Sequence, residues 1–192
     1  SKAFTGGAVN GNSYDMTVGG INLKVTGWSD TGDIDPGNNN DTIQTAKLIW
    51  ASTNALGIQN QDENTADPNH SIDGVTSDTD GEFDMLLLTF DTAVSLTGLT
   101  LNWAQGGNAA NTADISILAW NGSGSSTISG KTWGNVLASN GGGYTKVGSY
   151  ANVGLSYFSI PTSIESTKWL IGVYNPVFGA LAGADTADDG MK

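Results

Sequence analysis

The strongest constraint on the fold of this chain is its short-range pattern. Brief runs that alternate apolar and polar residues, or are apolar throughout, are separated by loops of Gly, Asn, Asp and Ser, and no long 3.6-residue pattern occurs. This pattern predicts an all-β chain, an antiparallel β-sandwich of jelly-roll type. The expected strands cover residues 14–18, 21–28, 44–51, 85–90, 98–104, 114–120, 144–150, 157–160 and 168–174.

The length of 192 residues fits one β-sandwich domain, because sandwiches of about 200 residues commonly form a single unit. Within residues 1–192 we expect an extended N-terminal strand over residues 1–12. Residues 176–192 are expected to form a C-terminal tail that leads towards a removed or missing sorting segment. The run 85–90 is apolar on both faces, so we place it in the middle of a sheet, covered on both sides.

Charge narrows the range of partners. Seven lysines and no arginine stand against nineteen carboxylates, which gives a formal net charge of -12. A surface of this kind repels phosphate backbones, so we expect no nucleic-acid partner, and no membrane partner because the apolar runs are far shorter than about 20 residues. The absence of cysteine excludes disulfides, thiol catalysis and thiolate metal sites.

Two acidic loops supply the oxygen ligands that Ca²⁺ prefers. The phrase DTDGEFD carries Asp78, Asp80, Glu82 and Asp84, with Gly81 at the turn. A second loop carries Asp30, Asp33, Asp35 and Asp41. Calcium is therefore the expected cofactor, and plain solvation is the alternative for either loop. Paired carboxylates of a glycosidase are a further alternative, because their spacing rule is spatial and the sequence does not test it.

Other catalytic signatures are weak. The single histidine, His70, stands in PNHS, and no G-x-S-x-G motif occurs, so we interpret His70 as a structural loop residue tied to Asp67, Asp73 or backbone groups. Residues 130–132 (GKT) resemble the end of a phosphate-binding loop, but the earlier glycine is misplaced by one position. We therefore predict no enzymatic activity.

Six tryptophans raise the possibility of sugar stacking, because pyranose rings pack on exposed aromatic faces. Five of them fall in or at the ends of expected strands, where core packing explains most of them. Trp133 follows a Gly/Ser loop and is the one that we expect to be exposed.

The order of several phrases resembles a known family. These are GWSDTG (27–32), LGIQN (56–60), DENTADPNHSIDG (62–74), FDMLLLTFDTAVSLTGLTLNWA (83–104) and ADISILAW (113–120). They resemble the exosortase-dependent, PEP-CTERM-type surface proteins of bacteria over residues 22–175. The resemblance implies export and an extracellular or bacterial cell-surface location, in a surface layer or biofilm matrix. It implies no catalytic residues.

These observations lead to two functional hypotheses. The first is a non-enzymatic structural protein that self-associates into a filament or matrix, with calcium bridging the acidic loops. Strand donation is its expected route, by which residues Ala3, Phe4, Thr5, Ala8 and Val9 complete a neighbour's sheet. The alternative for this segment is an ordinary edge strand of its own domain. The second hypothesis is a carbohydrate-binding module that retains exopolysaccharide, with Trp133 as a stacking residue.

Overall fold

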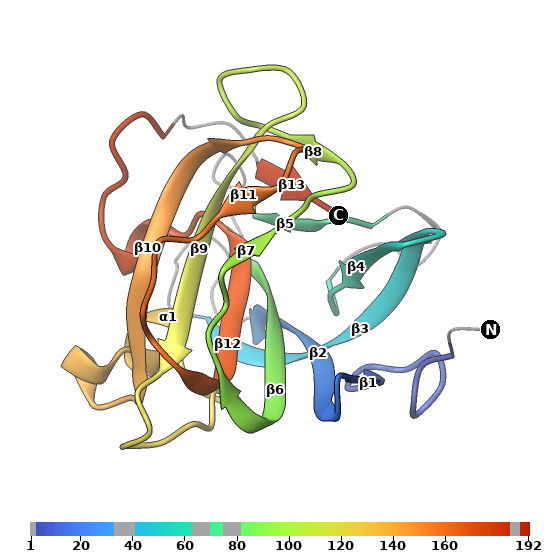
Figure 1. Ribbon diagram of the computed structural model, residues 1–192, viewed down its shortest axis with the longest axis vertical. Helices are drawn as coiled ribbons and strands as arrows, with labels where there is room; N and C mark the ends of the chain where they lie inside the picture. Colours follow the sequence, from blue (N-terminus) through green and yellow to red (C-terminus); the bar gives the residue numbers. More distant parts are fainter. Residues whose placement is uncertain (1–2, 33–40, 63–69, 75–81, 185–188) are drawn as a thin grey trace.

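The computed structural model describes residues 3–32, 41–62, 70–74, 82–184 and 189–192. In these residues the chain is all-β and its strands pair antiparallel (Figure 1). The helical content is small: α1 (Trp133–Val136) and the 3-10 helices η1 (Ala138–Asn140) and η2 (Pro176–Phe178).

One large sheet has the order β10-β9-β12-β6-β2-β3-β4, with β1 also paired to β2. Since β6 occupies one edge of β2, the strands β1 and β3 share the other edge, one beside each half of β2. The bounds of these strands are β1 (Ser13–Val18), β2 (Ile21–Gly32), β3 (Thr42–Ser52), β4 (Ala55–Gln59), β6 (Asp84–Val94), β9 (Ala113–Trp120), β10 (Tyr144–Val153) and β12 (Ser166–Val173).

Two smaller sheets complete the architecture. The first has the order β5-β13-β8, from β5 (Ile72–Gly74), β13 (Asp189–Met191) and β8 (Ala104–Gln105). The second pairs β7 (Gly98–Leu99) with β11 (Phe158–Ser159). The predicted strand 98–104 is thus split into β7 and β8, which belong to different sheets.

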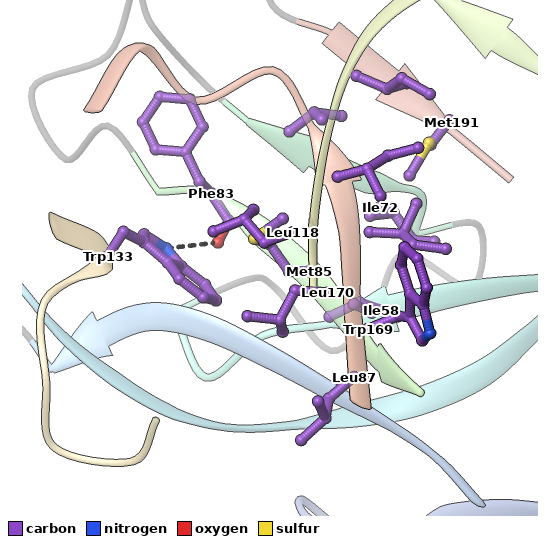
Figure 2. Packing of buried hydrophobic residues seen from close by; sticks show 14 of the residues in the cluster. Ile58, Ile72, Phe83, Met85, Leu87, Leu118, Trp133, Trp169, Leu170 and Met191 are labelled. Carbon is purple, nitrogen blue, oxygen red and sulfur yellow. Dashed lines mark hydrogen bonds between the residues drawn. The ribbon is translucent and has the colours of Figure 1, made fainter. Parts of the chain in front are cut away.

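The central strands of the large sheet are covered on both faces. On the face that we call the inner face, Asp84 accepts a hydrogen bond from the backbone of Asp73 in β5. On the opposite, outer face, the Trp133 ring from α1 lies near Met85 and Leu118 (Figure 2). The prediction that residues 85–90 lie in the middle of a sheet is confirmed, because β6 runs between β12 and β2. The most completely buried strand is β9, in which residues 113–119 are all buried.

The N-terminal segment folds against its own sheet. Thr5 forms a single antiparallel bridge with Ser13, and the segment between them is made of turns and bends, so residues 3–12 do not form the extended strand that we expected over residues 1–12. The Phe4 ring stacks on Trp50 with a centroid distance of 5.3 Å and meets Tyr14 edge-on. This aromatic contact fixes the segment beside β1 and β3.

The segment in which we expected a C-terminal tail, residues 176–192, contains the short elements η2 and β13. Its last described residues form β13, which pairs with β5 on one side and β8 on the other (Figure 1). Met191 is buried and packs into the common core near Ile72 (Figure 2). The pattern DGM is too short to show a two- or 3.6-residue period, which is why the strand was not predicted.

Candidate functional site

Asp30 in β2 belongs to a group of acidic side chains at one end of the large sheet, together with Glu82 and Asp62. The Asp30 side chain is buried, and its Oδ1 accepts a hydrogen bond of 2.6 Å from the backbone N–H of Phe83. The Phe83 carbonyl in turn accepts a hydrogen bond of 3.2 Å from the Trp133 indole N–H. Burial raises the pKa of Asp30 to about 7, against the lowering effect of the Phe83 hydrogen bond. Asp30 is thus part of the packed structure rather than a loop residue in solvent.

Glu82, from the DTDGEFD phrase, lies within electrostatic reach of Asp30. Its Oε2 accepts a 3.0 Å hydrogen bond from the Asn60 side-chain amide. The Asn60 side-chain oxygen accepts from the backbone N–H of Asp62, so one amide holds both acidic residues. Burial and the negative charge of Asp62 raise the pKa of Glu82 to about 8, and Asp30 contributes in the same direction. The cluster therefore favours protons or cations over free carboxylates.

A second acidic pair lies on the inner face. Asp84 is fully buried, and its Oδ2 accepts from the Asp73 backbone N–H at 3.4 Å. Asp73 Oδ2 accepts a 2.8 Å hydrogen bond from the Ser71 hydroxyl. Burial raises the pKa of Asp73, while Ser71, Asp84, His70 and Lys192 oppose that rise. His70 therefore lies within electrostatic reach of Asp73.

The expected calcium ligands are divided by this geometry. Asp30 and Glu82, which come from different loops, lie within electrostatic reach of each other, whereas Asp84 points to the inner face with Asp73. Asp33, Asp35, Asp78 and Asp80 lie outside the described residues. Within the described residues no three His, Asp or Glu side chains converge in a geometry that could hold a metal. Calcium binding therefore stays a prediction.

The expectation that Trp133 is exposed is wrong. Its side chain is only 2% exposed, because α1 lays the ring against the outer face and Phe178 of η2 meets it edge-on. A pyranose ring has no open face of Trp133 on which to stack. The loop of Gly and Ser before it indicated an exposed position, but the capping of α1 by Thr132 turns the next residue inward.

A groove that the sequence did not indicate lies at Trp50. It has a volume of about 390 Å³ and is lined by Trp50, Ser52, Thr53 and Asn54 at the β3–β4 turn. A neighbouring cleft of about 220 Å³ shares Asn54 and continues over apolar side chains of the inner face, including Leu56 and Leu86. The half-buried ring of Trp50 and the exposed hydroxyl and amide groups are the kinds of group that bind sugars.

Comparisons with known proteins found no relative of this chain. No protein-family model, no curated protein and no solved structure matches the chain. In the described part of the chain, no helix has the length and apolar character needed to cross a membrane.

Proposed function

We propose that this chain is a non-enzymatic structural domain of the bacterial cell surface or extracellular matrix, and that it associates with copies of itself. The observation that supports self-association is an apolar surface at the N-terminal edge of the large sheet. Val9, Met16 and Val18 are 56%, 37% and 65% exposed. Met16 and Val18 are two residues apart in β1, so their side chains lie on the same side of that strand. Neighbouring exposed apolar side chains are typical of interaction surfaces.

Strand donation by Ala3, Phe4, Thr5, Ala8 and Val9 remains part of this proposal in a modified form. In the single chain, Phe4 already occupies the face of its own Trp50. Exchange between copies would place Phe4 on the Trp50 of a neighbour, with the same contacts and without a new fold. Head-to-tail exchange of this kind does not close and extends into a fibre. Jelly-roll topology also remains a proposal, supported by the second layer β5-β13-β8 across the inner face.

Calcium has a separate role in this proposal. Acidic loops on neighbouring copies repel each other at a net charge of -12, and a divalent cation between them relieves that repulsion. We expect calcium to promote assembly and a chelator to reverse it.

The experiment is negative-stain microscopy with light scattering on the purified chain, in calcium and in chelator. Val18→Lys places a charge in the exposed apolar surface and is expected to abolish assembly, whereas Val177→Lys, at an exposed site on η2, is the matched control and leaves it intact. Particles that stay monomeric under every condition would contradict the structural role. Assemblies that survive Val18→Lys would place the interface elsewhere.

A carbohydrate-binding role is the second candidate, because of the Trp50 groove. Soluble polysaccharide is expected to change tryptophan fluorescence in the native chain. Asn54→Ala should weaken the change, while Asn10→Ala, an exposed residue outside the groove, should not. An identical response in both variants would exclude the groove as the binding site.

A further inference from the structure

We propose that Asp84, Asp73 and Ser29 form a buried site for a hard divalent cation, Ca²⁺ in particular, between the large sheet and β5. This site would act within one chain and stabilise its fold. It is independent of self-association and of calcium between neighbouring copies.

The sheet register brings two of these side chains together. Ser29 in β2 lies directly opposite Asp84 in β6, and side chains at such positions share a face with Cβ atoms about 4.5–5.5 Å apart. Both residues are 0% exposed. Asp73 closes the niche from β5, because its backbone N–H donates to Asp84 and its carboxyl group interacts directly with that of Asp84.

Ser29 provides an independent indication of a ligand. Its hydroxyl is fully buried, and within the described part of the chain it has no hydrogen-bond partner. The Thr31 hydroxyl, two residues along the same strand, is also buried and has no hydrogen-bond partner within the described residues. Buried hydroxyl groups are nearly always hydrogen-bonded or bound to an ion, because removing them from water is otherwise unfavourable.

The chemistry of the niche suits a divalent cation. The buried Asp84 carboxyl group and the half-buried Asp73 carboxyl group together carry up to two negative charges, which a single Ca²⁺ balances. Calcium takes six to eight oxygen ligands in flexible geometry, so serine and threonine hydroxyls and backbone carbonyls can complete the set. Such a site contains only two carboxylates, in agreement with the lack of a three-carboxylate group among the described residues. A proton shared by Asp73 and Asp84 is the competing arrangement.

The test is thermal unfolding and calorimetric titration of metal-stripped protein at concentrations where light scattering shows a monomer. Calcium at about 100 times its dissociation constant is expected to raise Tm by about 5–10 °C for a chain of this size. Asp84→Asn should lose this rise completely, and Ser29→Ala should weaken calcium binding about tenfold. Asp91→Asn, a surface carboxylate that binds Asn22, is the matched control and should keep the full response.

The outcomes separate this site from the surface proposal. Because Asp84→Asn removes a buried negative charge, the metal-stripped variant should be at least as stable as the metal-stripped native chain. Absence of a calcium response in this variant would therefore not be due to unfolding. A native Tm that calcium leaves unchanged would overturn the proposal in favour of the shared proton. A calcium response lost in Glu82→Gln but kept in Asp84→Asn would move the cation to the acidic cluster at Asp30. These measurements use monomeric protein, so their outcome does not depend on whether the chain self-associates.

Discussion

Asn12 shows how one side chain can stand in for a stretch of strand. Its amide group donates to the Leu48 carbonyl at 3.0 Å, and its Oδ1 accepts from the Leu48 N–H at 2.7 Å. These are the two hydrogen bonds of a β-ladder, made at the point where β1 begins and β3 has parted from β2. The residue is 1% exposed, so no water replaces either bond.

Asn12→Asp is therefore expected to destabilise the fold by about 2–3 kcal/mol, because it removes the donor, leaves the Leu48 carbonyl unpaired and buries a charge. Urea unfolding measures the change. Asn10→Asp, two residues away and exposed, is the matched control and should stay within about 0.5 kcal/mol of the native chain. Equal stability of the two variants would show that the Leu48 bonds contribute little.

Tyr144 gives the fold a dependence on alkaline pH. Burial raises the pKa of its hydroxyl, which donates to the Ser126 carbonyl. The unfolded chain releases this proton near pH 10, about its ordinary value, while the folded chain retains it. Tyr144 therefore leaves the free energy of unfolding unchanged below about pH 10. Above that pH it lowers the free energy of unfolding by about 1.4 kcal/mol per pH unit.

Tyr144→Phe should remove the part of the pH dependence of the free energy of unfolding that Tyr144 causes. Urea unfolding between pH 9 and pH 11, about one unit on each side of the ordinary tyrosine pKa, measures it. Tyr157→Phe, at a ring that is 65% exposed, is the control and should keep the native slope. The account fails if both variants follow the native curve.

Single residues also show where the sequence misleads. Asp30 looks like part of a solvated loop because four carboxylates follow each other closely, yet it is buried under α1. Trp133 looks exposed because its neighbours are Gly, Ser and Thr, yet a four-residue helix turns it inward. In each case burial depends on a contact between residues 50 or more positions apart in the chain, which local composition does not encode.

At the scale of elements, the strands of six or more residues were predicted well from the sequence. The strands β1, β2, β3, β6, β9, β10 and β12 each overlap a predicted run, since alternation or continuous apolarity is visible over that length. The sequence did not predict β4, β5 or β13, which have five residues or fewer and contain glycine. Their pairing partners, rather than their own composition, determine their structure.

Glycine in β4 has a packing role that predicts a sharp effect. A Cβ atom at Gly57 would lie 2.1 Å from the His70 carbonyl oxygen, so Gly57→Ala must separate β4 from residues 70–71. The hydrogen bond from Ile58 N–H to the Ser71 carbonyl would be lost as well. We expect a loss of about 2–3 kcal/mol, in the range of overpacked cores and broken buried hydrogen bonds.

Chemical denaturation of Gly57→Ala measures this loss. Gly154→Ala is the control, because a Cβ atom there meets nothing closer than 3.9 Å. A Gly57→Ala variant as stable as Gly154→Ala would mean that β4 and residues 70–71 are not held together as described.

At the scale of the whole molecule, the two layers depend on β13. Deletion of residues 189–192 removes the middle strand of β5-β13-β8, the buried Met191 side chain and the acceptor for the Asp114 N–H. The loss of the methionine side chain alone is expected to cost about 2–5 kcal/mol. We expect the shortened chain to bind a hydrophobic dye and to lose cooperative unfolding.

Lys192→Ala is the control for this deletion. The half-buried Lys192 lies over the Trp103 ring at 5.0 Å, an interaction worth about 0.5–2 kcal/mol. This variant should therefore unfold cooperatively at nearly the native midpoint. A shortened chain that unfolds as sharply as Lys192→Ala would show that the large sheet is stable without the second layer.

The position of β13 also sets an order of events during synthesis. The strands β5 and β8 emerge from the ribosome long before residues 189–191, but they cannot form their sheet until those residues arrive between them. The large sheet can assemble from residues 13–173, while its inner face stays uncovered until the last strand arrives. A growing chain is therefore open over Ile72 and Ala104, and it acquires its finished interior only after residue 191 has left the ribosome.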